Sequence, residues 1–489
     1  MGKKIPLWAV LLVLLIAVLT FVYARGILAF MGLPCGYGDM HMPLIVSTIV
    51  AAIVAVAYGW KWNVLEKGML DAIGRPMQAL LIMLAVGIMI STWIAGGIVP
   101  SMIFYGLKIL TPTTFLMSSC VLCLIIALAT GSSWTTIGTV GLALIGIGTT
   151  LGFSAGATAG AAIVGAYAGD KMSPLSDTTL MAPAVAGTDV MTHVRHMMWT
   201  VTPSFLISLV VFLILGLRAN ANANMSQIAS MQNALLDNFK ISPLLLIPPL
   251  LVLGVVIMKA PALPGMFLGI IAGAILGSIT QGIPMGDWFD IMHYGFKFSD
   301  STGIDPFVVS LLQRGGMSSM LWTFNMTICV MCFAGVMDAS GMMGTLTDAL
   351  LKHAKGRGSL VLVTILTCIT VNVVACSQYL SILLTGRMYK RAFEDQRLRP
   401  ENLSRILEDA GTVTSPLVPW NSCGVTILAM IGVPTVEYFR YAVLCYVNPI
   451  ISAIYGYTGF SMTKLTDEEY EKILAQRAED TKNELAAAT

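Results

Sequence analysis

The chain has few charged residues. Asp, Glu, Lys and Arg make up 11% of its 489 residues, whereas soluble domains carry roughly 25%. These charges fall in short clusters between apolar runs, and many runs reach the roughly 20 residues that a helix needs to span a bilayer. Because 56% of the residues are hydrophobic, the composition excludes an ordinary soluble globule. It predicts an all-α polytopic membrane protein.

The chain also lacks the motifs of several catalytic classes. It has no Walker loop and no visible nucleophile–base pairing, so we expect neither ATP-driven transport nor an enzyme. Cys120-x-x-Cys123 and Cys329-x-x-Cys332 have the spacing of metal or redox pairs. Each pair lies inside an apolar run with no further ligand nearby, which favours small apolar side chains on a helix face. We therefore expect no cofactor.

Positive charge marks the cytoplasmic side of a membrane protein. Lys3 and Lys4 place the N-terminus inside, and we favour an uncleaved first helix over a signal peptide because many more apolar runs follow. The further basic groups that we place inside are Lys61, Lys67 and Arg75; His193, Arg195 and His196; Lys259; Lys352, Lys355 and Arg357; residues 387–405; and the tail. His193 and His196 could sense pH, but a role in the positive-inside pattern is favoured. Both termini are predicted to be cytoplasmic.

Two apolar stretches have the wrong length or flanks for simple spans. Residues 360–385 begin and end beside clusters that we place inside, yet two crossings would need about 40 residues. We predict a re-entrant hairpin with its tip near Ser377. The charge-free stretch 113–150 is predicted to form a second hairpin from the opposite face, with its tip within 130–136. The polar residues that we expect at the tips include Ser133, Thr135, Asn372 and Ser377.

A Gly-x-x-x-Ser-Pro-Leu segment occurs twice, at residues 169–175 and 411–417. The basic clusters give the two copies opposite orientations, which predicts an inverted-topology repeat of the kind that secondary transporters use for alternating access. We expect about ten spanning helices and two re-entrant hairpins. The predicted divisions are a first repeat (1–217), an external linker (218–240), a second repeat (241–460) and a cytoplasmic tail (461–489).

Pro174 and Pro416 predict a break in each of these helices. Proline donates no backbone hydrogen bond and disfavours helical geometry in the residue before it. Freed carbonyls and half-helix ends near mid-membrane then become ion ligands. Side chains with hard oxygens surround the breaks, namely Ser173, Ser176, Thr178 and Thr179 at the first and Thr412, Thr414, Ser415, Asn421 and Ser422 at the second.

Carboxylates decide which ion is coupled. Asp170 and Asp177 lie at the expected membrane depth, where a charge costs several kcal/mol unless it is paired or functional. One carboxylate holds either a proton or a cation, and this competition yields antiport. Asp177 directly follows the break and is the favoured ion holder, whereas Asp170 either couples protons or forms a structural pair with Lys171. For Glu408 and Asp409 a solvated helix start is favoured, with proton coupling by Asp409 as the alternative.

The two repeated segments resemble the signatures of the NhaC-type Na+/H+ antiporter family. The matching residues are Gly-Asp-Lys-Met-Ser-Pro-Leu-Ser-Asp-Thr-Thr at 169–179 and Leu-Glu-Asp-Ala-Gly-Thr-Val-Thr-Ser-Pro-Leu-Val-Pro-Trp-Asn-Ser-Cys-Gly at 407–424. The resemblance implies an inner-membrane carrier of the ion-transporter superfamily, with a scaffold, a moving transport domain and usually a homodimer. Some members resemble exchangers of malate and protons for lactate and sodium. Leu180 stands where many relatives have Asn, so one possible ligand is missing.

The leading hypothesis is a Na+/H+ antiporter that exchanges cytoplasmic Na+ for external protons. Its predicted Na+ site consists of Asp177, Ser176, Thr178 and Asn421. A Na+- or H+-coupled exchanger of small organic anions is the alternative, because Lys171 and half-helix N-termini could bind a carboxylate. A channel is a third possibility, and ionisable groups at both breaks favour a carrier over it. The expected partners are lipid, Na+ and protons, and no nucleic acid.

Overall fold

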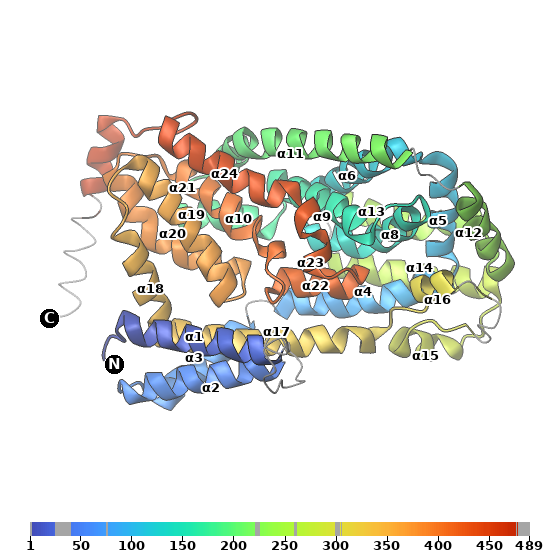
Figure 1. The fold of residues 1–489 in the computed structure, drawn as a ribbon, viewed down its shortest axis with the longest axis horizontal. Coiled ribbons are helices and arrows are strands. Elements are labelled where there is room, and N and C mark those ends of the chain that lie inside the picture. The colour runs from blue at the N-terminus through green and yellow to red at the C-terminus, as the bar shows by residue number, and fades with distance from the viewer. Residues whose placement is uncertain are drawn as a thin grey trace.

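A computed structural model describes residues 2–24, 41–74, 77–220, 225–258, 262–298, 304, 306–475 and 477 (Figure 1). The described residues are almost entirely helical, and the extended pairing among them is an isolated bridge between Leu398 and Lys464. This confirms the all-α class. Arg75, Lys259 and the end of the predicted tail, residues 478–489, lie outside the described residues.

The first half of the chain consists mainly of apolar helices. They are α1 (Leu7–Ala24), α2 (His41–Ala57), α3 (Trp62–Gly74), α4 (Met77–Ala95), α5 (Ile98–Ile109), α6 (Pro112–Thr130), α7 (Ser133–Thr136), the π-helix η2 (Ile137–Gly141), α8 (Leu142–Thr150), α9 (Ala155–Met172), α10 (Asp177–Ala186) and α11 (Val190–Asn220). The predicted linker contains a helix of its own, α12 (Met225–Asn238).

The second half has the same character. Its elements are the 3₁₀ turn η3 (Pro243–Leu246), α13 (Ile247–Ile257), α14 (Ala262–Gln281), α15 (Asp287–Tyr294), α16 (Pro306–Leu312), α17 (Met317–Ala339), α18 (Met342–Leu351), α19 (Arg357–Val374), α20 (Gln378–Asp395), α21 (Pro400–Ile406), the π-helix η4 (Leu407–Thr412), the 3₁₀ turn η5 (Ser415–Leu417), α22 (Ser422–Ile431), α23 (Thr435–Tyr438), the 3₁₀ turn η6 (Phe439–Tyr441) and α24 (Val443–Thr458).

Several helices have the length and composition of membrane spans. Five described helices are long and apolar enough to cross a bilayer, and up to eight spans result if each bent helix pair counts as one. Two shorter apolar helices cover residues 7–20 and 41–57. Together these helices make the chain a multi-pass membrane protein.

Both predicted hairpin tips are places where the chain turns back on itself. At the second, the hydroxyls of Thr367 and Tyr389 lie 2.6 Å apart across α19 and α20, so these helices lie side by side around the turn at 375–377. At the first, the chain leaves α6 through Gly131 and returns along α8. There the Phe115 and Phe153 rings stack with centroids 5.7 Å apart.

The two repeated segments are broken where their prolines predict. The helix α9 ends at Met172, and α10 begins only at Asp177. In the second segment the π-helix η4 gives way to the short turn η5, and α22 begins at Ser422.

The two broken helices run in opposite directions. A Cβ at Gly156, near the start of α9, would lie 2.3 Å from the carbonyl oxygen of Glu437, which follows α22. A Cβ at Gly187, just after α10, would lie 3.0 Å from Lys390 Nζ, which precedes α21. An inverted repeat requires this antiparallel arrangement, whereas the division of the chain at 217 and 241 stays a prediction.

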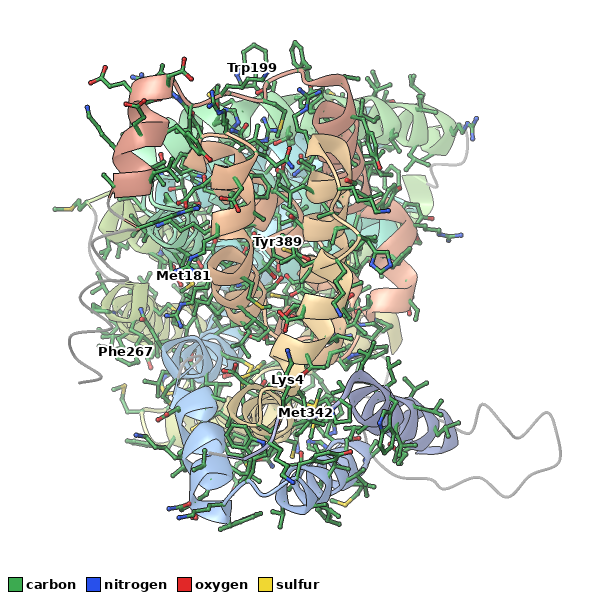
Figure 2. All side chains as sticks on the ribbon, turned by 90° about the vertical axis from the view of Figure 1, so that its left-hand side faces the viewer. Lys4, Met181, Trp199, Phe267, Met342 and Tyr389 are labelled. Atoms are coloured by element: carbon green, nitrogen blue, oxygen red, sulfur yellow. The ribbon has the colours of Figure 1, made fainter. Side chains whose placement is uncertain are left out.

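Several of the basic clusters gather at one end of the helix bundle. Lys4 pairs with Asp348 of α18 at 2.8 Å, and the Lys3 backbone donates to the Tyr58 carbonyl near the end of α2. The helices α18, α20 and α21 lie at this end, on the left of Figure 1. Figure 2 looks onto it, with Lys4 and Tyr389 labelled. The described clusters that we placed inside at these helices therefore share one side of the protein.

Glycines allow the α6 and α9 helices to pack closely. A Cβ added to Gly165 would lie 2.0 Å from the carbonyl oxygen of Cys120. Small residues at such contacts let two helix backbones approach in a bilayer, where there is no hydrophobic force between helices.

Gly165→Ala should therefore destabilise the protein by about 1–3 kcal/mol, because the added methyl group overlaps the α6 backbone. Thermal unfolding of the purified protein in detergent measures the effect. The matched control is Gly254→Ala in α13, where a Cβ meets nothing within 4 Å. If both substitutions lower the unfolding temperature equally, close packing of α6 on α9 is not the cause.

Candidate functional site

A buried ion cluster lies where the two broken helices cross. The Lys171 side chain, at the end of α9, is fully buried. Its Nζ lies 2.9 Å from Glu408 Oε2 of the π-helix η4 and 3.6 Å from Asp170 Oδ2. Glu408 is also fully buried, and Asp170 is 6% exposed. One ammonium group thus joins carboxylates from both halves of the chain.

Hydroxyl groups complete the surroundings of this cluster. Ser133 donates from the first hairpin to Asp170 Oδ2 at 2.9 Å. Lys171 donates to the Thr178 hydroxyl, which lies 3.2 Å from the Ser176 hydroxyl. Thr412 donates to Glu408 Oε2. The cluster therefore receives oxygen atoms from both broken helices and from the first hairpin.

Two carboxylate oxygens in the cluster have no hydrogen-bond partner among the residues that the structure describes. They are Asp170 Oδ1 and Glu408 Oε1, and both are buried. Buried polar atoms are nearly always satisfied, so these two oxygens are candidates to hold a proton, an ion or a water molecule. With both carboxylates ionised, two negative charges face the single positive charge of Lys171. One negative charge then remains uncompensated, which a single proton or monovalent cation would neutralise.

A π-helix presents the Glu408 carboxylate to Lys171. The stretch η4 contains Glu408, Asp409 and Gly411, and a second π-helix, η2, follows the first hairpin tip. Widened helical turns of this kind are rare and are frequently found at functional sites. No sequence pattern used above predicts them.

Asp409 belongs to a second buried group beside the first. Its Oδ1 accepts hydrogen bonds from Thr200 of α11 at 2.9 Å and from Asn448 of α24 at 2.6 Å. Its Oδ2 lies 3.8 Å from Arg405 Nε. Glu408 and Asp409 are both 0% exposed. The prediction of a solvated helix start is therefore wrong, because the neighbouring helices cover this turn completely.

Asn372 anchors the second hairpin to the second broken helix. Its Nδ2 donates to the Gly411 carbonyl at 2.6 Å and to the Thr414 hydroxyl at 3.1 Å. Its own carbonyl accepts from Asn421 at 3.0 Å. The amide oxygen of Asn421 is used to cap α22, and the Ser422 hydroxyl also donates to it. These residues hold the break in shape beside the ion cluster.

Asp177 lies outside the buried cluster. It is exposed at the start of α10, and Oδ2 accepts a hydrogen bond from Tyr379 of the second hairpin at 3.1 Å. Leu180 is 46% exposed. Asp177 thus bridges the first broken helix and the second hairpin.

The remaining predicted ligands make local contacts. Thr135 donates to the Ser132 hydroxyl. Ser173 caps the turn between α9 and α10 by accepting from the Leu175 backbone. Ser377 accepts from the Leu380 backbone at the start of α20. Of the predicted Na+ ligands, Thr178 and Ser176 lie at the ion cluster. Asp177 bonds to Tyr379, and Asn421 belongs to the anchor around Asn372.

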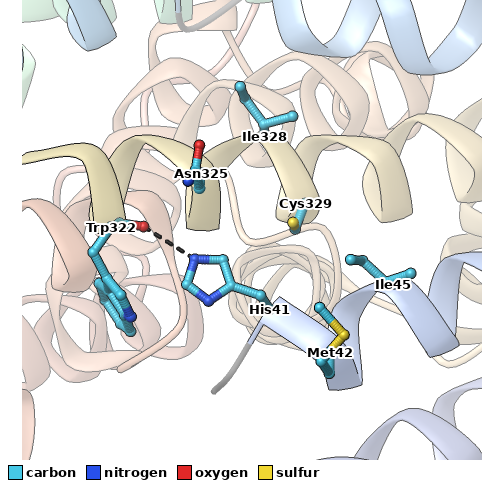
Figure 3. A pocket seen from close by; sticks show the side chains of 7 residues that line it. All are labelled: His41, Met42, Ile45, Trp322, Asn325, Ile328 and Cys329. Atoms are coloured by element: carbon cyan, nitrogen blue, oxygen red, sulfur yellow. Dashed lines mark hydrogen bonds between the residues drawn. The ribbon is translucent and has the colours of Figure 1, made fainter. Parts of the chain in front are cut away.

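A surface pocket of about 520 Å³ lies elsewhere, between α2 and α17 (Figure 3). His41 donates there to the Trp322 carbonyl at 3.1 Å, and Met42 is 56% exposed. Its lining includes no residue of the buried ion cluster. Within the described residues, no group of three or more His, Cys, Asp or Glu side chains could hold a metal ion.

Residues 165–460 match the profile of the Na+/H+ antiporter family. This range includes both helix breaks and the Asp170, Lys171 and Glu408 cluster. The chain belongs to the Na+/H+ antiporter family.

Curated relatives of this family cover most of the chain. The Na+/H+ antiporter NhaC of Alkalihalophilus pseudofirmus is 37% identical over 427 residues, which cover 87% of this chain and 92% of the relative. The malate-2H+/Na+-lactate antiporter of Bacillus subtilis is 34% identical over 421 residues, covering 86% and 89%. The arginine/ornithine antiporter ArcD of Halobacterium salinarum is 34% identical over 436 residues, covering 88% and 89%. Antiport is common to these names, whereas the substrates differ.

The pairing of Glu408 with Lys171 is the feature that sequence reasoning missed. A signal was present, because Lys171 lies within the first repeated Gly-x-x-x-Ser-Pro-Leu segment and Glu408 lies three residues before the second. An antiparallel crossing of two such segments brings Lys171 and Glu408 together.

The net charge of the buried ion cluster predicts how substitutions at Lys171 and Glu408 change the stability of the protein. Lys171→Met leaves two buried carboxylates without a counter-charge and should destabilise the protein by about 3–5 kcal/mol at alkaline pH. Glu408→Gln removes the excess negative charge and should unfold at or above the wild-type temperature. The double variant restores the wild-type net charge and should recover most of the loss. Thermal unfolding in detergent tests this order, and additive effects would contradict the pairing.

Proposed function

We propose that this protein is a secondary active transporter that exchanges cytoplasmic Na+ for external protons by alternating access. Membership of the Na+/H+ antiporter family supports this function. The observation that carries it is the sharing of Lys171 by Asp170 and Glu408, each with one unpartnered buried oxygen.

The electrostatics of this cluster support exchange of one cation for another. Removing one partner from a buried ion group leaves an uncompensated charge that costs several kcal/mol. The cluster is therefore stable with one bound proton or one bound Na+, and unstable with neither. Two bound cations would leave an excess positive charge. A site that must hold one ion or the other couples the two fluxes.

Hard oxygen atoms suit the site to Na+ rather than to a softer metal. We propose that Asp170 and Glu408 hold the ion, with hydroxyls from Ser133, Thr178 and Thr412. Asp177 would receive the ion at the entrance, where it bonds to Tyr379, and Asp409 would take part in proton coupling. The predicted role of Asp177 as principal ion holder remains the alternative to test.

The antiparallel broken helices suit alternating access. We propose that the regions 1–217 and 241–460 form inverted repeats, with the ion cluster at their crossing. Movement of one repeat relative to the other, around Lys171 and Glu408, would open the site to one side of the membrane and then to the other.

The basic residues and the resemblance to the NhaC type also support a location and an oligomeric state. We propose a bacterial inner membrane protein with both termini in the cytoplasm, as the positive-inside rule suggests for the end that carries Lys4 and residues 387–405. We also propose a homodimer, as the resemblance to the NhaC type implies.

A Na+- or H+-coupled exchanger of small organic anions is the second candidate, because a relative carries malate and lactate. A carboxylate substrate would need a cation in the site. Lys171 is already engaged by Glu408, Asp170 and Thr178, which favours a simple cation site. Na+-driven uptake of radiolabelled malate or lactate into proteoliposomes would reverse this preference.

Proteoliposomes that contain a pH-sensitive dye should show proton movement when a Na+ gradient is imposed. Asp170→Asn and Glu408→Gln should abolish it, because neither variant retains the excess negative charge that recruits a cation. Asp177→Asn should lower the apparent Na+ affinity but leave exchange measurable. Complete loss of exchange in Asp177→Asn, with exchange retained in Asp170→Asn and Glu408→Gln, would support Asp177 as the principal ion holder, as the sequence predicts. No Na+-dependent signal in the wild type at any pH would refute antiport.

Competition also predicts the pH dependence. Where protons occupy the site, the apparent KM for Na+ should fall about tenfold for each unit of rising pH, and it should level off once the site is deprotonated. Initial rates of exchange at matched membrane potential measure this. A KM independent of pH would show that Na+ and protons bind at separate sites.

A further inference from the structure

The two hairpin tips are built in the same way. Each begins with a residue in the left-handed region of the backbone, which is Gly131 with φ 65° at the first tip and Cys376 with φ 53° at the second. A serine follows each of them and caps the next helix, because the hydroxyls of Ser132 and Ser377 accept from the backbone three residues further on. The two tips are therefore structurally equivalent, residue by residue.

An aromatic residue stands at the third position after each left-handed residue. It is Trp134 at the first tip and Tyr379 at the second. Trp134 is 8% exposed and lies beside the Cys423 thiol at the start of α22. Tyr379 is half-buried, and its hydroxyl donates to Asp177 Oδ2 at the start of α10 at 3.1 Å. Each hairpin thus directs an aromatic side chain to the helix that follows the break in the other half of the chain.

The second tip is a strained turn that is tied to both broken helices. A residue other than glycine in the left-handed region costs energy, and it persists only where its surroundings impose it. The Cys376 carbonyl accepts from the Ser422 backbone at 3.0 Å, and its side chain packs in a buried cluster with Met326 and Val425. The tip is therefore held by α22 on one side and, through Tyr379, by α10 on the other.

The buried ion cluster lies one layer beneath the surface that Tyr379 contacts. Asp177 is exposed, whereas its neighbours Ser176 and Thr178 are 2% and 3% exposed. The Thr178 hydroxyl accepts from Lys171 at the centre of the cluster. The hydrogen bond between Tyr379 and Asp177 therefore lies directly over the proposed ion site.

An exposed stripe of α10 leads from this surface to the end of the bundle that carries the basic residues. Its positions are Asp177, Leu180, Ala184 and, just after the helix, Gly187. They recur at intervals of three or four residues, so they share one face of the helix. A Cβ on Gly187 would lie 3.0 Å from Lys390 Nζ. A carboxylate exposed to lipid is costly, which favours water rather than lipid along this stripe.

We propose that Tyr379 is a gating residue that closes the route along α10 to the ion cluster. While its hydroxyl holds Asp177, the second hairpin tip stays over the break. When that hydrogen bond opens, the tip moves away from α10, and the buried hydroxyls beneath it become accessible from the end that carries Lys390. Trp134 has the equivalent place over α22 and would close the opposite route. The inference rests on the proposed function, because a gate serves transport only if an ion reaches the cluster.

Hydrogen–deuterium exchange of the purified full-length protein measures how often this route opens. Tyr379→Phe removes the hydroxyl and keeps the ring, so the packing of the tip is retained. A hydrogen bond to a charged group is strong enough that its loss should raise the exchange rate of the backbone amides of residues 175–180 about tenfold. Tyr379→Trp keeps a donor, as at the first tip, and should exchange more slowly than Tyr379→Phe.

Tyr389→Phe is the matched control. The Tyr389 hydroxyl belongs to the same hairpin but bonds to Thr367 within it, at 2.6 Å, so its removal should leave the exchange of residues 175–180 unchanged. Peptides of α14, which packs on α4 and α13, report global unfolding in every variant. The gate is refuted if Tyr379→Phe exchanges like the wild type, or if Tyr389→Phe speeds exchange as much as Tyr379→Phe does.

A thiol label tests the direction of the route. Leu180→Cys places a thiol on the exposed stripe of α10, and a charged, membrane-impermeant thiol reagent is added to either side of vesicles with known orientation. Peptide-resolved mass spectrometry separates this thiol from the native cysteines. The thiol should react from the side that carries the N-terminus and not from the other. Reaction from the opposite side only, or from neither side, would show that α10 does not line this route.

These measurements need no ion flux, so the gate and the proposed function fail separately. Faster deuterium exchange in Tyr379→Phe, without Na+-dependent proton movement in the wild type, would sustain the gate and refute antiport. Na+/H+ exchange by the wild type, with unchanged deuterium exchange in Tyr379→Phe, would sustain antiport and refute the gate.

Discussion

The Lys171 ammonium group between Asp170 and Glu408 is the interaction on which the rest of the structure depends. A fully buried lysine is costly unless it is paired, and its partners come from different broken helices. Pairing therefore requires the two helices to meet at this point. The hairpins, the π-helix η4 and the hydroxyls around the breaks all hold this crossing in shape.

The two halves of the chain contribute differently to the site, although each contains a hairpin and a broken helix. The first broken helix contributes Asp170 and Lys171, and the second contributes Glu408 and Asp409. The second break is fastened by Asn372, whereas the first hairpin contacts the cluster through Ser133. One hairpin thus reaches the ion cluster and the other supports the helix that carries Glu408. The two hairpins therefore make different contacts with the broken helices.

Relatives of this chain are named for different substrates. Relatives that are 34% identical to this chain are named for organic acids or amino acids, which shows that one architecture serves several antiporters. In this chain the central cation is engaged by two carboxylates and a threonine. That engagement leaves Asp170 Oδ1 and Glu408 Oε1, rather than the ammonium group, without a hydrogen-bond partner among the described residues. Similarity to the family alone therefore does not determine the substrate.

The sequence by itself determined the class, the hairpin tips and the helix breaks, because these depend on local properties. Scarcity of charge, Pro174 and Pro416 act within one segment of chain, and the structure places the breaks beside them. It also pointed to Asp170. Only the tertiary structure decided that Glu408 is the partner of Lys171 and that Asp177 is exposed. The burial of Glu408 depends on helices that are distant in sequence, and the π-helical turn that directs its carboxylate has no local signature. Pairing between two crossing helices is a property of their packing, which a reading of each segment alone cannot supply.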